Sequence, residues 1–311
     1  MPEVLVTEPV HRDALALLRA GGCVVTDGTT LDQGAFEAAL ARAEILLVRI
    51  LKLDPARMAA PLRMVAKHGV GVDNIPLEAA RTGGIVVANT PGANANAVAE
   101  HTLMLMLALA KSLPRMTAAA LRDGRPDRTA RVVDLAGRRL LLIGFGRTAQ
   151  RVAALAQAFG MSVTVMSPRL RGEVTHEGYR IARDLRHAVQ SADVLSLHCP
   201  LTPATQGLIG AAELALLPDG AYVINAARGG LINEAALAAA THLGGFAVDV
   251  VADEPIRPEN PLLHAANGIV TPHSAAMSAE AFRQMGMDAA QNILDYLAGR
   301  LNPAHTVVAG R

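Results

Sequence analysis

The 311-residue sequence has few cysteines, almost no net charge and no long apolar run, and each shortage excludes a class of protein. Its two cysteines, Cys23 and Cys199, lie far apart beside apolar, strand-like runs, which indicates buried free thiols in a reducing compartment rather than a disulfide. The formal net charge of +1 comes with scattered basic residues, so we expect neither a nucleic acid nor an anionic membrane as a partner.

The chain also lacks the marks of a membrane span or a secretion signal. The most apolar run, Leu103 to Ala110, is much shorter than the ~18 residues that a spanning helix needs, and the N-terminus has no basic segment followed by an apolar core. The histidines other than His198 and His273 show no metal-ligand spacing with cysteines or carboxylates, so we expect no metal site. These features predict a cytoplasmic protein that binds a small molecule.

Apolar residues make up 51% of the sequence, which is enough to bury two domain cores in a chain of this length. Over the first ninety residues, β-branched runs alternate with Ala/Leu-rich helical stretches, a rhythm typical of βαβ units and a parallel sheet. The expected helices there cover residues 13–20, 32–43 and 77–82, and expected strands include 64–67 and 85–89. A long helical pattern over residues 94–121, interrupted near Pro114, leads out of this first lobe.

Six strand-like runs follow, and helical segments separate the first five of them. They end at Gly144, Ser167, Cys199, Ala226, Val251 and His273. This order predicts a doubly wound parallel sheet, with a last helix near residues 278–299. We therefore predict an α/β protein with two Rossmann-like or flavodoxin-like doubly wound domains, each with a parallel sheet.

A glycine loop follows the first strand of the second lobe and opens a helix. Gly144 and Gly146 allow a tight turn in which backbone N–H groups meet a pyrophosphate at the helix N-terminus, and Ala149 is small enough for close helix packing. A glycine turn at an ordinary strand-to-helix junction is the alternative. The second strand about twenty residues on favours dinucleotide binding.

The end of that second strand lacks the acidic residue that usually binds the ribose 2′-hydroxyl of NAD. Ser167 stands there instead, and Arg169 and Arg171 follow it. The arginines are either solvated loop charges or ligands of a 2′-phosphate, and Pro168 fixes the backbone before them. We predict that NADP is preferred to NAD.

Three further strand ends carry an arginine, a carboxylate and a histidine. Arg228 can grip a carboxylate with two hydrogen bonds, and His273 titrates near neutrality and can give and retake a proton. Glu254 beside His273 would raise the pKa of the imidazole. Together they match what hydride transfer to a 2-keto acid requires. Asp249, expected inside the fifth strand, is either a structural carboxylate or a contact of the nicotinamide carboxamide.

With these motifs the chain resembles the D-isomer-specific 2-hydroxyacid dehydrogenase family, which includes glyoxylate/hydroxypyruvate reductases and phosphoglycerate dehydrogenases. The segments that carry the resemblance are GVGVDNI from Gly69, NTPGANANAVAEHT from Asn89, GFGRTAQ from Gly144, HCPLTPATQGLI from His198, NAARGGLINEAAL from Asn225, VDVVADEP from Val248 and TPHSA from Thr271. The resemblance implies a discontinuous substrate domain of residues 1–95 plus 280–311, an NAD(P)-binding Rossmann domain of residues 96–279, and a homodimer.

The resemblance also implies roles for individual residues. Arg228, Glu254 and His273 match the family's catalytic set, and the loop of Gly69, Val70 and Gly71 offers backbone N–H groups to the substrate carboxylate. The family's dinucleotide contacts fall on Arg147, Thr148, Cys199, Pro200, Thr205, Ala226, Ala227, Arg228, Asp249 and His273. The implied activity is the reversible reduction of a small 2-keto acid, glyoxylate or hydroxypyruvate, to the D-2-hydroxy acid.

The sequence departs from the family at a few positions. Thr148 and Ala149 replace the last two residues of the usual G-x-G-R-I-G loop, and Ser167 replaces the acidic residue. Glu254 stands where formate dehydrogenases have glutamine, and Val70 where phosphite dehydrogenases have lysine, so we expect neither specialisation. Two alternatives stay open: oxidation of phosphoglycerate, and a non-catalytic scaffold that senses a dinucleotide.

Overall fold

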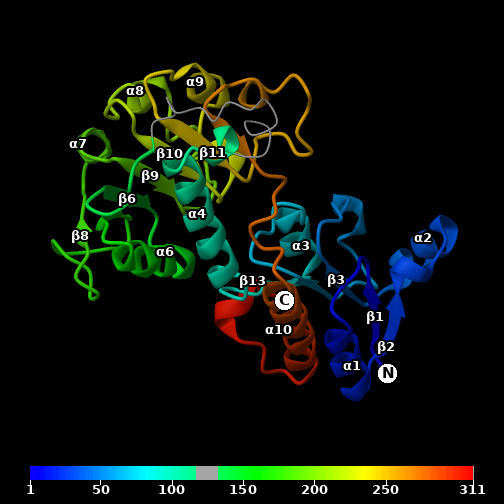
Figure 1. Cartoon of the computed structure of the whole chain (residues 1–311). Coiled ribbons are helices and arrows are strands. Elements are labelled where there is room, and N and C mark those ends of the chain that lie inside the picture. Colours follow the sequence, from blue (N-terminus) through cyan, green and yellow to red (C-terminus); the bar gives the residue numbers. More distant parts are fainter. Residues whose placement is uncertain (117–131, 311) are drawn as a thin grey trace. The chain divides into compact units, whose positions relative to one another are not determined.

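The computed structural model describes residues 1–116 and 132–310, and the chain divides into two compact units. Unit 1 comprises Met1–Asn94 and Met277–Arg311, and unit 2 comprises Ala95–Ala276. Each unit has its own sheet, as Figure 1 shows. In the part of the chain that the structure describes, no helix is both long enough and apolar enough to cross a membrane.

Unit 1 contains a six-stranded sheet in the order β13-β5-β4-β3-β1-β2. Its strands are β1 (Glu3–Val6), β2 (Val24–Asp27), β3 (Ile45–Val48), β4 (Met64–Lys67), β5 (Val86–Ala88) and β13 (Thr306–Val308). Its helices are α1 (Arg12–Ala20), α2 (Gln33–Arg42), α3 (Leu77–Gly83) and α10 (Ala279–Leu297). Strands β1 to β5 run parallel in the flavodoxin-like order 2-1-3-4-5, and β13 joins the edge antiparallel to β5.

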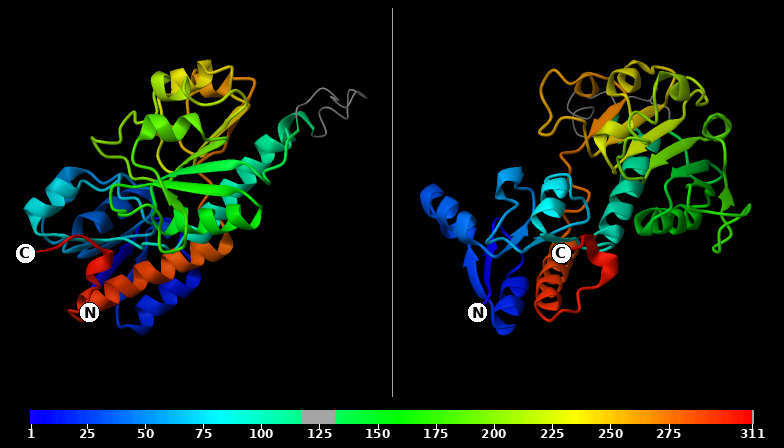
Figure 2. Two further views of the ribbon diagram at one scale, coloured as in Figure 1. Left: turned by 90° about the vertical axis from the view of Figure 1, so that its left-hand side faces the viewer. Right: turned by 180° about the vertical axis from the view of Figure 1, so that it is seen from behind.

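Alternate residues of the unit 1 strands enter two cores, one on each face of the sheet. Val4, Val6 and Met64 pack with α1 and α10 on one face, whereas Leu5 and Val65 pack with α2 and α3 on the other. Both views in Figure 2 show α10, drawn in orange, beside α1. The last helix therefore packs on the sheet formed by the first ninety residues, because residues of α10 fill the same core as α1.

Unit 2 contains a seven-stranded, fully parallel sheet in the order β12-β11-β10-β9-β6-β7-β8. Its strands are β6 (Arg139–Ile143), β7 (Ser162–Met166), β8 (Arg180–Ile181), β9 (Val194–Leu197), β10 (Tyr222–Asn225), β11 (Gly245–Val248) and β12 (Gly268–Val270). The helices among its described residues are α4 (Ala95–Ala110), α6 (Arg147–Ala158), α7 (Leu185–Gln190), α8 (Ala211–Leu214) and α9 (Glu234–Ala239). The order is that of a Rossmann sheet, with its switch point between β6 and β9.

Two cores also flank the sheet of unit 2. Leu140 and Leu142 of β6 face α4 and α6, whereas Leu141 and Ile143 face α7, α8 and α9. Figure 1 shows α4 and α6 on the side of the sheet opposite α8 and α9. Because both faces are covered, the strands are continuous apolar runs and the polar side chains gather at the strand ends.

The prediction of two doubly wound α/β domains is confirmed, with differences of detail. The two-residue β8 and the antiparallel β13 were not predicted, because such short segments carry no clear periodicity. The helix expected over 94–121 stops at Ala110 and is followed by a turn in which Ser112 has a φ of 50° before Pro114. Residues 117–121 of that expected helix lie outside the described residues.

All six predicted strands of unit 2 end earlier than predicted, four of them by one or two residues and two of them by three. Strand β11 ends at Val248 rather than Val251, and β12 ends at Val270 rather than His273. Asp249 therefore follows its strand instead of lying inside it, which corrects the prediction. Pro272, which has no N–H group to donate to a neighbouring strand, follows β12.

Candidate active site

The glycine loop between β6 and α6 has the geometry of a dinucleotide-binding turn. Gly144 has a φ of 97°, a conformation that favours glycine, and its N–H donates to Met166 O at 2.7 Å. Gly146 is the N-cap of α6, and among the described residues no atom lies within 4 Å of where its side chain would stand. Gly146 has no side chain to cap the first N–H groups of α6, an arrangement that suits a pyrophosphate, and Ala149 in the first turn is buried.

The switch point of the sheet brings a second loop against this turn. A Cβ on Gly144 would stand 2.5 Å from His198 O and 2.8 Å from Cys199 N, so only glycine allows the two backbones to meet. The half-buried Cys199 and the exposed Pro200 begin this loop, and Thr205 closes it by donating to Pro200 O at 2.7 Å. Burial raises the pKa of the Cys199 thiol, which keeps it protonated. The two loops thus lie at the carboxyl ends of β6 and β9, where doubly wound sheets bind ligands. They contain Gly144, Gly146, Cys199, Pro200 and Thr205.

The two arginines of the segment after β7 differ in their hydrogen bonds. The Arg171 guanidinium donates to Pro168 O at 2.7 Å and to Leu170 O at 2.8 Å, so it folds back on its own loop. Arg183 braces the same loop by donating to Leu170 O at 2.9 Å. Arg169 is exposed and makes no hydrogen bond or ion pair with the described residues, and Ser167 is half-buried at the strand end.

A buried asparagine shapes the segment that carries Arg228. Asn225, the last residue of β10, accepts from Ala227 N at 3.0 Å and donates to Arg228 O at 2.7 Å. These bonds fix the turn of Ala226 and Ala227 and place Arg228 directly before the 3-10 helix η4 (Gly229–Leu231). The Arg228 side chain is half-buried, and its guanidinium donates to Ala227 O at 2.6 Å.

Glu254 and His273 form a hydrogen-bonded pair, with 2.7 Å between Glu254 Oε2 and His273 Nδ1. The bond to Glu254 and the carboxylate charge raise the pKa of His273 above its ordinary value, against the effect of burial. Partial burial raises the pKa of Glu254, but the hydrogen bond and the charges of His273 and Arg228 outweigh it and lower the pKa overall. The pair therefore favours a carboxylate next to an imidazolium.

Asp249 holds the loop that carries His273. Its buried carboxylate accepts from Thr271 Oγ1 at 2.6 Å, from Ser274 N at 2.8 Å and from Ala275 N at 2.8 Å. The backbone N–H of His273 donates to Asp249 O at 2.8 Å, and His273 itself has a φ of 53°. Such a φ is unfavourable for a residue with a Cβ, so the bonds to Asp249 stabilise it.

A histidine of α4 lies near the Asp249 carboxylate. His101 Nε2 lies 3.2 Å from Thr271 Oγ1 and 3.5 Å from Asp249 Oδ1. The Nδ1 atom of His273 is occupied by Glu254, so Nε2 is the atom left to exchange a proton with a bound molecule. The chemistry that this site can perform is general acid and base catalysis beside a fixed guanidinium.

The glycine loop of unit 1 offers two N–H groups. Gly69 N donates to Thr90 Oγ1 at 3.1 Å, whereas Val70 N and Gly71 N have no hydrogen-bond partner within residues 1–116 and 132–310. Asn89 donates to Val70 O at 2.7 Å and so fixes the loop. Burial lowers the pKa of the neighbouring His68 to about 4, so its imidazole is neutral near pH 7 and is not a proton donor.

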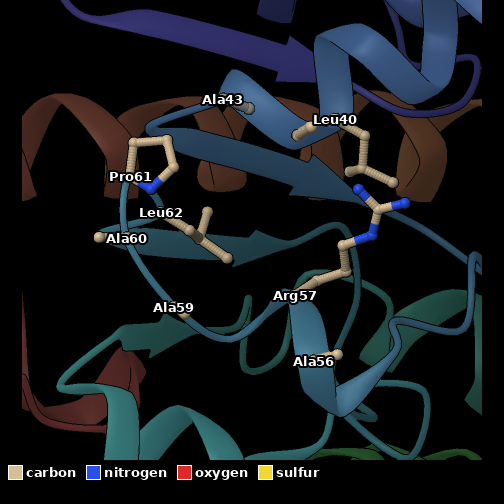
Figure 3. A pocket seen from close by; sticks show the side chains of 9 residues that line it. Leu40, Ala43, Ala56, Arg57, Ala59, Ala60, Pro61 and Leu62 are labelled. Atoms are coloured by element: carbon tan, nitrogen blue, oxygen red, sulfur yellow. The ribbon is translucent and has the colours of Figure 1, made fainter.

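A small pocket on unit 1, shown in Figure 3, does not lie at the carboxyl ends of the strands, where doubly wound sheets bind ligands. Ala43 and Leu62 line it, and each stands just before a strand, β3 or β4. It therefore lies at the amino ends of the strands, and its charged residue Arg57 is paired with Glu37. In the described ranges, no cluster of three His, Cys, Asp or Glu side chains could hold a metal ion.

Asn225 and His101 were not assigned roles from the sequence. A signal existed for both: Asn225 ends an apolar strand, and His101 stands in the apolar helix α4. A polar group in such a position needs a partner, which a sequence alone does not identify.

Comparison with known proteins matches most of unit 2 to one family. Residues 103–275, more than half of the chain, match the D-isomer specific 2-hydroxyacid dehydrogenase, NAD binding domain. The D-3-phosphoglycerate dehydrogenase of Methanocaldococcus jannaschii is 39% identical over 310 residues, which cover 97% of this chain and 58% of that enzyme. The chain thus spans less than two thirds of this relative.

Two other similar proteins match along most of their length. The glyoxylate reductase of Aeropyrum pernix is 34% identical over 321 residues, which cover 97% of this chain and 95% of that enzyme. A crystal structure of a protein from Thermus thermophilus superposes with a TM-score of 0.87 at 36% identity, covering 98% of this chain and 100% of that one.

The raised pKa of His273 gives a first prediction. Glu254→Gln keeps a hydrogen-bond acceptor but removes the negative charge, so the pKa of His273 should fall, and the imidazolium should be lost at lower pH. Histidine NMR titration measures this, with the signal assigned by its loss in His273→Ala. Glu259→Gln, an exposed carboxylate on the same loop, is the control. An unchanged pKa in Glu254→Gln would show that the pair does not control the imidazole.

Proposed function

Because the chain belongs to the D-isomer specific 2-hydroxyacid dehydrogenase family, we propose that it reduces a small 2-keto acid to the D-2-hydroxy acid with NAD(P)H, reversibly. The observation that carries this proposal is the Glu254–His273 pair, joined at 2.7 Å. The charge of Arg228 acts on both members of the pair. A cation, a proton donor and a carboxylate thus stand together just beyond the strand ends.

Each group has a distinct task in this proposal. The N-terminus of α6 would hold the pyrophosphate of the dinucleotide, which would supply the hydride. Arg228 binds the substrate carboxylate and polarises the carbonyl, because its guanidinium is planar and permanently charged. His273 Nε2 delivers a proton to the carbonyl oxygen, and Glu254 stabilises the imidazolium before that transfer. Residues Gly69, Val70 and Gly71 join the substrate ligands in this proposal through the family resemblance.

The two directions of the reaction require opposite states of His273. Reduction needs the imidazolium, and oxidation needs the neutral imidazole. Since Glu254 raises the pKa of His273, reduction is sustained to a higher pH than an isolated histidine would allow, and it declines as the pH rises through that pKa. Oxidation shows the reverse dependence and is favoured at alkaline pH.

Glyoxylate and hydroxypyruvate are the proposed substrates. The similarity to the Aeropyrum pernix glyoxylate reductase supports this choice, because it extends over 95% of that enzyme. Oxidation of phosphoglycerate is the second candidate, which the 39% identity to a phosphoglycerate dehydrogenase favours. The paired Glu254 and His273 argue against a scaffold that only senses a dinucleotide, because such a scaffold has no use for an imidazolium. A homodimer and a cytoplasmic location, expected from the family and the two free cysteines, belong to this proposal.

We include a preference for NADPH in the proposal. Ser167 replaces the acidic residue that would repel a 2′-phosphate, and the exposed Arg169 has no partner among the described residues to compete with one. A charge-assisted bond from Arg169 is worth ~1.5 to 3 kcal/mol, or about tenfold or more in preference. Arg171 directs its donors to Pro168 O and Leu170 O and so supports the loop. The proposed dinucleotide contacts also include Arg147, Thr148, Cys199, Pro200, Thr205, Ala226, Ala227 and Asp249.

The acid role of His273 predicts a loss of turnover. His273→Ala should lower kcat for glyoxylate or hydroxypyruvate by ~10² to 10⁴ while dinucleotide affinity stays near that of the wild type. Steady-state kinetics and fluorescence titration of the reduced dinucleotide separate the two effects. His187→Ala, an exposed histidine of α7, is the control. Wild-type turnover in His273→Ala would remove this residue from the mechanism.

The cofactor proposal is tested by kcat/KM for NADPH and NADH over a panel of 2-keto acids. The wild type should prefer NADPH, and Ser167→Asp should reverse this by repelling the 2′-phosphate. Arg169→Ala should lower kcat/KM for NADPH about tenfold and leave kcat/KM for NADH nearly unchanged. Arg180→Ala, which removes another exposed arginine of unit 2, serves as the control. A clear NADH preference in the wild type contradicts the proposal.

A further inference from the structure

The two loops that carry Arg228 and Glu254 are packed against each other through their backbones. Gly229, which follows Arg228, is buried, and a Cβ built on it would stand 1.9 Å from Val251 C and 2.3 Å from Ala252 N. No side chain fits in that space, so the segment of Val251 and Ala252 rests directly on Gly229. The position of the Glu254 loop is therefore set against the Arg228 loop.

The carboxylate of Glu234 joins helix α9 (Glu234–Ala239) to the loop that carries Glu254. Glu234, the first residue of α9, accepts from Ala252 N through Oε1 at 2.6 Å and from Asn260 Nδ2 through Oε2 at 2.8 Å. Asn260 is also the N-cap of the 3-10 helix η5 (Pro261–Leu263), and its side chain accepts from Leu262 N at 3.0 Å. Glu234 thus grips the loop at two points, and Glu254 lies between them in the sequence.

The N-cap hydrogen bond of the helix that begins with Glu234 is made by the preceding residue. Asn233 is the N-cap of α9, and its side chain accepts from Ala236 N at 3.0 Å. The two hydrogen bonds of the Glu234 carboxylate go instead to the loop of residues 252–260. The arrangement is that of a brace between loops rather than of a helix cap.

We propose that Glu234 is a positioning residue that holds Glu254 in hydrogen-bond distance of His273. The inference rests on the proposed function only in taking that pair as the catalytic one. Without the brace, the loop keeps its contact with Gly229 at one end but loses its fixed points at Ala252 and Asn260. Glu254 then spends less time on His273 Nδ1, and the imidazolium loses its partner.

The groups that face His273 come from three segments. Glu254 bonds its Nδ1, Asp249 lies beneath its loop, and Arg228 lies beyond the end of β10. Among the residues that the structure describes, the His101 side chain of α4 bonds Thr271 and lies near Asp249, and it makes no hydrogen bond with His273. Glu254 and Asp249 raise the pKa of His273 and Arg228 lowers it, so withdrawal of Glu254 must lower that pKa.

The test is a histidine NMR titration, with kcat/KM against pH for reduction of glyoxylate by the same proteins. Glu234→Ala should lower the pKa of His273 and should lower kcat/KM by about tenfold. Glu234→Gln, which keeps an oxygen for Ala252 N, should remain within about threefold of the wild type. Asn260→Ala removes one of the two hydrogen bonds of the Glu234 carboxylate and should lower the pKa of His273 by a smaller amount. This variant replaces Glu234→Ala in the test if Glu234→Ala does not fold.

Glu213→Ala is the matched control. The Glu213 carboxylate also accepts a backbone N–H near the start of a short helix of unit 2, from Gly210 at 3.1 Å, but it touches neither loop. Its loss should leave the pKa of His273 unchanged. An unshifted pKa in Glu234→Ala overturns the inference, and so does an equal shift in Glu234→Gln, which would indicate an effect of charge alone. The failure of the proposed function is a separate result, namely full activity in His273→Ala.

Discussion

The buried carboxylate of Asp249 is the constraint on which the site depends. It lies just past β11, and its oxygens bind the Thr271 hydroxyl and the N–H groups of Ser274 and Ala275. These bonds hold the residue between them, His273, at a positive φ that its side chain would otherwise disfavour. The ring is thereby presented to Glu254. A buried carboxylate left without these donors would be costly, so the loop and the strand end stabilise each other.

The remaining parts of the site follow the same design, in which a polar side chain fixes the backbone of a loop. Asn225 shapes the turn before Arg228, and Glu234 grips the loop around Glu254. Gly144 and Gly229 act in the opposite way, since the lack of a side chain lets neighbouring backbones meet. The parallel sheet supplies the common edge, and these bonds set the positions within it.

Much of this could be predicted from the sequence, because Arg228, Glu254 and His273 follow parallel strands, whose carboxyl ends lie at one edge of the sheet. The glycine loop was equally predictable from its place between a strand and a helix. The roles of Asp249, Asn225 and Glu234 were not, because their partners are backbone groups whose positions depend on the loop conformation. The strand ends were misplaced for a related reason: apolar residues such as Val250 and Val251 continue past β11, although the ladder has ended.

The proposed mechanism requires that His273 Nε2 gives the proton while Arg228 holds the substrate carboxylate. A crystal structure of the chain with NADPH and oxamate, an unreactive analogue of a 2-keto acid, tests it most directly. We expect His273 Nε2 at about 2.7 to 3.1 Å from the carbonyl oxygen of oxamate, with both Arg228 bonds on its carboxylate. An oxamate that binds away from Nε2, or a His273 ring separated from Glu254 in that complex, would contradict it.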